Sequence, residues 1–206
     1  EEFSKAKRQQ IAYKEGDYFR VKLGRDKYTY GRILLDIYQG IKNKTLNYWD
    51  KFLGRALIVE TFHILTERKD VSIEELKTLK IFPAQYIMDN NLFYGDYEII
   101  GNDTLPAQLA YPIMYGEETK QDSSKKIIFQ CGRIHKEMEY RADKYYGDFL
   151  NNGIGFNIYA DERLIEQCLK EKSNNPYWER YDYYKDLRNP KYKKKKKKVL
   201  KEFELE

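Results

Sequence analysis

Cysteine, histidine and long apolar runs are scarce in this chain. Its 206 residues include two cysteines, Cys131 and Cys168, and two histidines. The cysteines lack the spacing of metal ligands, so we interpret them as reduced thiols of a cytoplasmic protein. No apolar run is long enough to cross a bilayer, and the visible start shows no signal-peptide pattern. We therefore expect neither a membrane span nor a secreted disulfide framework.

Catalytic signatures are missing as well. His63 lies in an apolar run and His135 lies near a hairpin turn, and neither has partners at the spacing that nucleophilic or metal chemistry needs. The stretch "GIGF" at 153–156 lacks the rest of a dinucleotide-binding fingerprint. Glu60 and Asp89 are conceivable groups for acid–base chemistry, but any chain with this many acidic residues offers such a pair, so the signal is weak. We expect no catalytic residue, metal or cofactor; an unrecognised hydrolase stays a remote alternative.

Positive charge is concentrated at the end of the chain. Residues 191–206 hold eight lysines and three glutamates, and their net charge of +5 equals that of the whole chain. Residues 1–190 are therefore neutral overall. A protein that neutralises many phosphates normally carries its basic residues on a folded face. We interpret the lysine run as a solvated, frayed helix, with nonspecific attraction to RNA, a membrane or an acidic partner as the alternative.

The stretch 17–38 has the pattern of a hairpin. Apolar and polar residues alternate over 17–23, and 24–27 has turn chemistry with Gly24 and Asp26. In 28–38 the alternation places Ile33, Leu35 and Ile37 on one face and Tyr28, Tyr30 and Arg32 on the other. We expect the second face to be at most part of a binding surface.

Further strands and helices follow from the same kind of pattern. Strands are expected over 56–66, 81–89, 96–102, 127–138 (a hairpin) and 153–160. Ser72 and Glu75 have the spacing of a capping box, so a short helix should reach about Leu79. Asp161 should cap a helix, and Asn-Pro pairs at 175–176 and 189–190 should open two more. The stripe of Tyr177, Tyr181, Tyr184 and Arg188 would either pack on the sheet or contact a partner.

These elements predict an α+β, β-rich fold: a twisted antiparallel sheet or partly open barrel, followed by a helical C-terminal third. The expected divisions are a polar arm (1–12), a β-rich main domain (13–160), a helical extension packed on it (161–190) and a lysine-rich tail (191–206). Because the chain starts at Glu1 without methionine, we expect part of the native N-terminus to be missing.

The opening hairpin resembles the immunity protein 26 family of bacterial polymorphic toxin systems. The resemblance rests on "KEGDYFRVKLGRDKYTYGRILLDIY", with Gly16-Asp17, Phe19, Leu23 and Tyr30-Gly31-Arg32 in the family's places. Downstream, "SIEELKTL", "IFPAQYIMD" and "DYEIIGN" follow the family's order, over roughly 12–115, and "NPYWERYDYYKDLRNPK" is similar to extensions of longer members. Lys22 departs from a common proline, and Tyr97 departs from the usual tryptophan.

The resemblance implies a β-rich, non-enzymatic cytoplasmic protein that binds and neutralises the toxin encoded beside it. Occlusion of the toxin's active or substrate-binding surface is the expected mechanism, and a basic nuclease is one toxin that acidic residues would suit. The candidate toxin-binding residues are Asp17, Asp36, Glu60, Asp89, Tyr94, Asp96, Tyr97 and Asp103. The alternative is a small RNA- or DNA-binding protein that uses a tyrosine-rich sheet and the lysine tail.

Overall fold

Two antiparallel sheets and a group of C-terminal helices make up the fold. The computed structural model describes residues 10–47, 55–119, 123–149, 158 and 161–206. Within these residues, a five-stranded sheet has the order β4-β3-β2-β1-β5 and a three-stranded sheet the order β6-β7-β8. Neither sheet closes on itself, so the predicted β-rich α+β class is confirmed. The strands are β1 (Asp17–Leu23), β2 (Lys27–Asp36), β3 (Ala56–Thr61), β4 (Gln85–Met88), β5 (Glu98–Asn102), β6 (Ile113–Thr119), β7 (Lys125–Cys131) and β8 (Ile134–Glu139).

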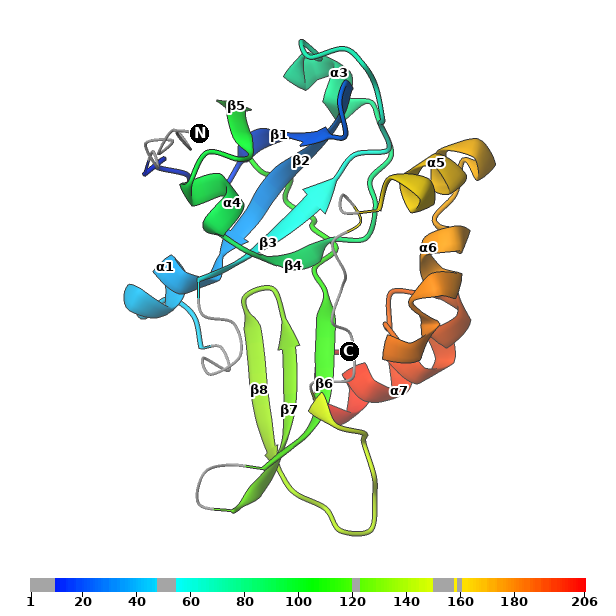
Figure 1. Ribbon diagram of the computed structural model, residues 1–206. Helices are drawn as coiled ribbons and strands as arrows, with labels where there is room; N and C mark the ends of the chain where they lie inside the picture. The colour runs from blue at the N-terminus through cyan, green and yellow to red at the C-terminus, as the bar shows by residue number, and fades with distance from the viewer. Residues whose placement is uncertain (1–9, 48–54, 120–122, 150–157, 159–160) are drawn as a thin grey trace, which may run out of the picture.

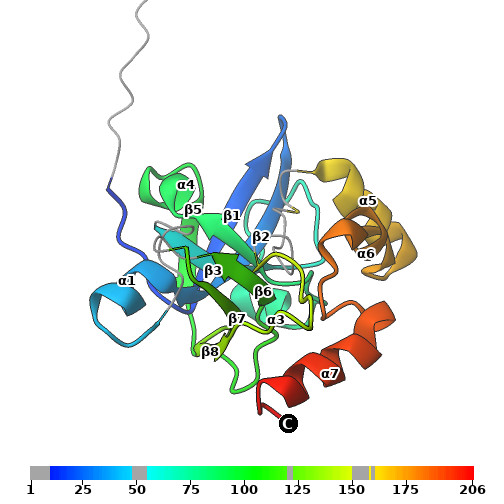
Figure 2. The ribbon, with the colours of Figure 1, turned by 90° about the horizontal axis from the view of Figure 1, so that it is seen from below.

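The helices lie at the ends of the sheets and beside them. Figure 1 shows the five-stranded sheet above the three-stranded one, with the C-terminal helices along the right. Seen from below, α1 and the C-terminal helices lie on opposite sides of the strands (Figure 2). No helix of the described segments is long and apolar enough to cross a membrane. The helices are α1 (Ile37–Lys42), α3 (Ile73–Lys77), α4 (Asn90–Phe93), α5 (Glu162–Glu171), α6 (Asn175–Arg180) and α7 (Lys193–Glu202), with 3₁₀ turns at Asp182–Tyr184 and Pro190–Tyr192.

The predicted hairpin is confirmed as β1 and β2. Leu23 pairs with Lys27 and Tyr18 with Arg32, so the three-residue loop 24–26 sets the register. Gly24 takes a φ of +60°, which glycine adopts at little cost. Strand β2 ends earlier than predicted, because the Asp36 side chain accepts a hydrogen bond from the Gln39 amide at 2.9 Å and caps α1. Ile37 therefore belongs to a helix.

Both faces of the five-stranded sheet are covered. One face packs Phe19, Val21 and Ile33 against α5 and α6. The other face buries Tyr18, Tyr30 and Phe62 beside the segment that carries α3. The face of β2 that carries Tyr30 and Arg32 is therefore not an open surface, because Tyr30 is 0% exposed and Arg32 7%. Period-two alternation cannot distinguish a solvent-exposed face from one that a later segment covers.

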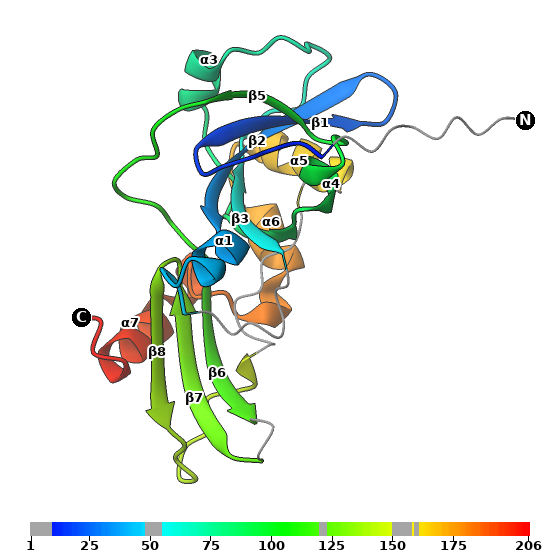
Figure 3. The same ribbon diagram turned by 90° about the vertical axis from the view of Figure 1, so that its left-hand side faces the viewer.

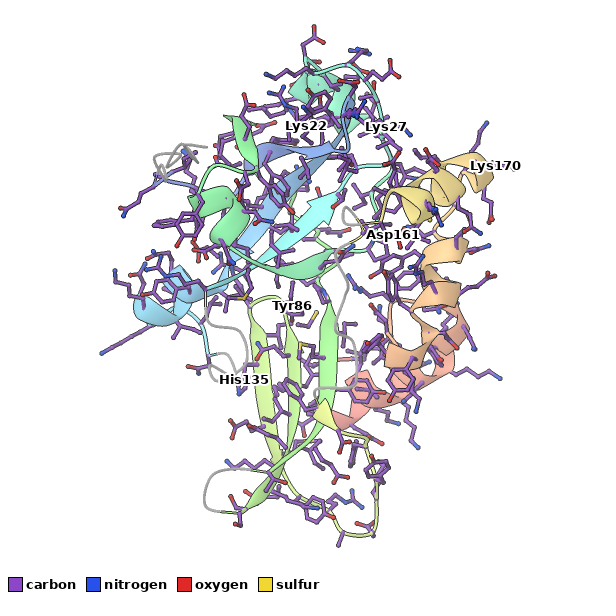
Figure 4. All side chains as sticks on the ribbon, viewed as in Figure 1. Lys22, Lys27, Tyr86, His135, Asp161 and Lys170 are labelled. Carbon is purple, nitrogen blue, oxygen red and sulfur yellow. The ribbon has the colours of Figure 1, made fainter. Side chains whose placement is uncertain are left out.

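The two sheets share one apolar cluster where they meet. Leu35, Ile58 and Tyr86 of the first sheet pack with Met114 and Ile128 of the second. Figure 3 shows the sheets following one another along the long axis of the molecule, and Figure 4 shows Tyr86 at their junction. Strand β6, which supplies Met114, is an edge strand of the second sheet. The predicted strand 153–160 lies outside the described residues except for Ile158, which is buried.

The predicted helix starts near the C-terminus are largely confirmed. Asp161 accepts a hydrogen bond from the Leu164 amide at 3.0 Å, and Asn189 accepts one from the Lys191 amide at 3.0 Å. The helix at Pro176 begins one residue earlier than expected, with Asn174 at the cap position. Because α6 ends at Arg180, the predicted tyrosine stripe does not lie on one helix.

The lysine-rich tail is a folded helix that packs on the second sheet. Val199 and Phe203 are buried in a cluster with Tyr115 and Phe129 of that sheet. The Lys136 ammonium donates a hydrogen bond to the Phe203 carbonyl at 2.7 Å. The apolar residues that follow the lysine run therefore anchor α7, and Lys195 also faces the sheet, with its ammonium 5.1 Å from the centre of the Tyr115 ring.

Candidate functional site

The Tyr30-Gly31-Arg32 motif lies at the centre of the five-stranded sheet. The Tyr30 hydroxyl donates a hydrogen bond to the Arg68 carbonyl at 2.9 Å and holds the loop before α3. A Cβ atom at Gly31 would lie 2.4 Å from Cζ of Phe19 and 2.8 Å from the Glu60 carbonyl oxygen. Glycine is therefore required for close packing between strands. Tyr30 and Gly31 thus have structural roles.

Arg32 forms a buried ion pair with Glu60 on the neighbouring strand. Its Nε lies 2.8 Å from Oε1 of Glu60, and its Nη2 contacts the same oxygen. Nη1 donates to the Tyr18 hydroxyl at 3.0 Å, and the guanidinium lies 5.3 Å from the centre of the Tyr18 ring. Burial raises the pKa of Glu60 above its usual range, although Arg32 opposes this shift.

This ion pair lines a pocket of about 400 Å³. The pocket lies where the sheet meets α3 and the loop that follows β5. Its lining residues are Tyr18, Arg32, Glu60, Phe62, Lys77, Leu79, Ile81, Asp103, Thr104 and Pro106. It therefore combines a charged interior with apolar walls, which is the usual composition of a binding site.

The charged residues at the pocket edge are paired with each other. Lys77 forms ion pairs with Asp103 and, at 2.9 Å, with Glu74. The contact with Lys77 lowers the pKa of Asp103, so this carboxyl is ionised at neutral pH. The Thr104 amide also donates to Asp103 at 2.7 Å.

The structure separates the eight predicted toxin-binding residues into two groups. Glu60 and Asp103 line the pocket, and Asp17 lies close by on β1. The remaining five lie at or beside the ends of α1 and α4: Asp36, Asp89, Tyr94, Asp96 and Tyr97. The sequence alone could not assign the eight residues to these groups, because the assignment depends on how the strands pair.

Four of the predicted acidic residues are buried and have partners inside the protein. Asp17 accepts from the Lys14 amide and from Asn102, both at 2.8 Å. The Tyr13 hydroxyl donates to Asp89 at 2.6 Å, and burial together with this bond raises the pKa of Tyr13. Asp36 caps α1, and burial raises its pKa. Asp17, Asp36 and Asp89 contribute to internal hydrogen bonding and do not line the pocket, so a partner has limited access to them.

The α4 patch, defined as Tyr94, Asp96 and Tyr97, is more accessible. Tyr94 is 41% exposed and Asp96 is exposed. Tyr97 is half-buried, and its ring stacks on Phe19 with a centroid distance of 5.8 Å. An exposed tyrosine beside an acidic residue is a common arrangement at protein interfaces.

The histidines and cysteines have structural surroundings. His63 Nε2 lies 2.7 Å from Asn174 Oδ1, and its ring stacks on Phe82 at 4.0 Å. Cys168 is buried in the core, and burial raises its pKa. Within the described part of the chain, no group of three or more His, Cys, Asp or Glu side chains could hold a metal ion.

Sequence reasoning missed several pocket residues. Tyr18 is one of them. The hairpin register, which the loop centred on Arg25 sets, brings Tyr18 opposite Arg32. Phe62 stacks on Tyr18 with a centroid distance of 5.7 Å. Lys77 reaches the pocket from α3, and no pattern in the sequence indicates that contact.

Comparison with known proteins places the chain in a class and then in a family. A family model described as immunity protein 26 matches residues 14–127, more than half of the chain. The chain is therefore an immunity protein, a non-enzymatic inhibitor that neutralises a toxin. It belongs to the immunity protein 26 family, as the opening hairpin predicted. The match spans the whole five-stranded sheet and β6 but not α5, α6 or α7. No curated protein and no solved structure gives a significant match.

Proposed function

We propose that this protein neutralises its toxin by direct binding that covers the toxin's active or substrate-binding surface. Membership of the immunity protein 26 family carries the proposal. The five-stranded sheet, buried on both faces, supplies the rigid scaffold that a stable interface of about 800 Å² on each partner requires. The toxin is the variable C-terminal domain encoded beside this protein, and both act in the cytoplasm.

A basic nuclease is the toxin class we propose. Nucleases attract phosphate with lysine and arginine. Asp96 and Tyr94 in the α4 patch offer acidic and aromatic contacts to such a surface, and the pocket that holds Glu60 and Asp103 offers acidic contacts on the opposite face of the sheet. Asp17, Asp36 and Asp89 would support these contacts from below the surface.

Binding of RNA or DNA by the sheet, the alternative expected from the sequence, has less support. Stacking of bases requires exposed aromatic faces. Tyr18, Tyr30 and Tyr115 are each at most 1% exposed. Weak attraction of nucleic acid to the lysines of α7 stays a prediction.

Co-expression tests the proposal. The neighbouring toxin domain is expressed in bacteria with and without this protein, and the purified pair is analysed by gel filtration. We expect growth to be rescued and the two proteins to elute together. Continued growth arrest without a complex would contradict the proposed function.

A further inference from the structure

The pocket contains a buried carboxylate that is bound on one oxygen only. Glu60 is 2% exposed, and both Nε and Nη2 of Arg32 donate to its Oε1. Among the hydrogen bonds of the described residues, none reaches Oε2. A carboxylate accepts bonds on both oxygens, so Oε2 can still accept a hydrogen bond from a further donor. The pocket that Glu60 lines is the place from which a further donor can approach.

The charges around the pocket favour a cation. Lys77 at the edge is already held by Asp103 and Glu74. The lining itself holds the two carboxylates Glu60 and Asp103 and the two cations Arg32 and Lys77, and Glu74 adds a third carboxylate outside the lining. Burial raises the pKa of Glu60, although its pairing with Arg32 opposes this shift.

The walls of the pocket suit an aliphatic chain. Phe62, Leu79, Ile81 and Pro106 line it, and Ile81 is 39% exposed. Lysine and arginine bury their methylene stems along apolar surface and keep the charged end at a polar group. A side chain of this kind would cover the walls and place a donor at Oε2.

We infer that the pocket around Arg32 and Glu60 receives a lysine or arginine side chain of the toxin as an anchor of the interface. This inference rests on the proposed function and names the part of the surface that recognises the toxin. Arg32 holds the Glu60 carboxylate in place, Oε2 accepts from the incoming cation, and Ile81 and Leu79 pack along its stem. Anchors that enter pockets near the centre of an interface contribute most of the binding energy.

A charge-swap pair at Ile81 tests the inference. Both Ile81→Lys and Ile81→Glu replace the apolar side chain with a flexible charged one, and the two charges are opposite. Affinity for the purified toxin domain is measured by calorimetry. We expect Ile81→Lys to weaken binding about tenfold or more, and Ile81→Glu to bind as well as the natural protein or better. Ile134→Lys is the matched control, because Ile134 is 45% exposed on β8, outside the pocket. It should change the affinity less than about twofold.

Glu60→Gln provides a second test. It keeps the shape of the side chain and removes its charge, and we expect at least a tenfold loss of affinity. Folding of the variant is checked by circular dichroism. If this variant does not fold, the affinities of the two Ile81 variants decide whether the inference holds.

The outcomes separate this inference from the proposed function. Equal affinities of the two Ile81 variants, or weaker binding by Ile81→Glu, would overturn the cationic anchor while toxin binding by the natural protein still supported the proposed function. Failure of the natural protein to bind the toxin would overturn both.

Discussion

Arg32 and Glu60 lie directly opposite each other in the β2–β3 ladder and form an ion pair that is almost excluded from water. The side chains are 9% and 2% exposed. A buried pair of this kind depends on both members, because either charge alone is strongly disfavoured away from water. The arginine of the Tyr-Gly-Arg motif therefore has a structural role that its position in a polar stripe did not reveal.

Replacement of Arg32 should destabilise the protein. We expect Arg32→Leu to lower the free energy of unfolding by about 3–5 kcal/mol, because Glu60 loses its partner inside the sheet. Urea unfolding measures the change. Arg68→Ala is the control, since Arg68 is 57% exposed where it pairs with Glu75. Its removal should cost much less than that of Arg32 because the pair is exposed to solvent, and equal losses for the two variants would contradict the structural role of the buried pair.

Gly31→Ala should be costly even though alanine is small. The added methyl group would meet the tip of the Phe19 ring and the backbone of Glu60. We expect a loss of about 1–3 kcal/mol in thermal or urea unfolding. Adding Phe19→Leu, which removes the tip of the ring, should recover part of the loss, so that the double variant is more stable than the sum of the single effects predicts. Strict additivity would argue against this contact.

Acid should weaken the attachment of the C-terminal helices through His63. Burial lowers the pKa of His63 from its usual 6.5, and its ring bonds Asn174 next to α6. As the pH falls below about 6.5, His63 of the unfolded chain binds a proton before His63 of the folded protein does. The stability that His63 contributes above about pH 6.5 is therefore lost as the pH falls toward the folded-state pKa. We expect the urea midpoint to fall more between pH 7.5 and 5.5 in the natural protein than in His63→Gln. Both proteins retain His135, so an identical fall in both would exclude His63 as the source.

The lysine-rich end should be part of the folded unit. Phe203 is 1% exposed, and its ring lies 5.1 Å from Phe129. We expect Phe203→Ala to lower the free energy of unfolding by about 3–5 kcal/mol. Lys197→Ala, an exposed position on α7, should change it by less than about 0.5 kcal/mol. An unchanged urea midpoint in Phe203→Ala would show that the tail does not stabilise the second sheet.

The α4 patch should contribute to toxin affinity if the proposed function is right. We expect the double variant Tyr94→Ala, Asp96→Lys to bind the toxin domain at least about tenfold more weakly while its circular dichroism is unchanged. Tyr145→Ala is the control, because Tyr145 is 75% exposed in the segment after β8. Similar affinities of the two variants would remove this patch from the interface.

Local chemistry made much of the fold predictable. The alternation over 17–23 and the turn at Gly24 correctly predicted the first hairpin, and the Ser72 and Asp161 caps correctly marked two helix starts. These features depend on residues within a few positions of one another. The family also followed from the hairpin, because Tyr30-Gly31-Arg32 and its neighbours form a short local pattern.

The candidate site could be predicted only in part. Glu60 and Asp103 were chosen for their charge, but their meeting in one pocket depends on the pairing of β2 with β3 and of β1 with β5. The stripe of Tyr177, Tyr181 and Tyr184 failed as a single helical face, because the chain leaves the α-helix after Arg180.

The sequence by itself determined the strands near the start, the helix caps and the family. Tertiary structure alone decided that the Tyr30 and Arg32 face is buried, that Glu60 supplies the opposite charge, and that α7 packs on a second sheet. The physical reason is that periodicity reports which residues share a face, whereas register and packing between distant segments decide what covers it. Arg32 and Glu60 are 28 positions apart, and only the β2–β3 register brings them together.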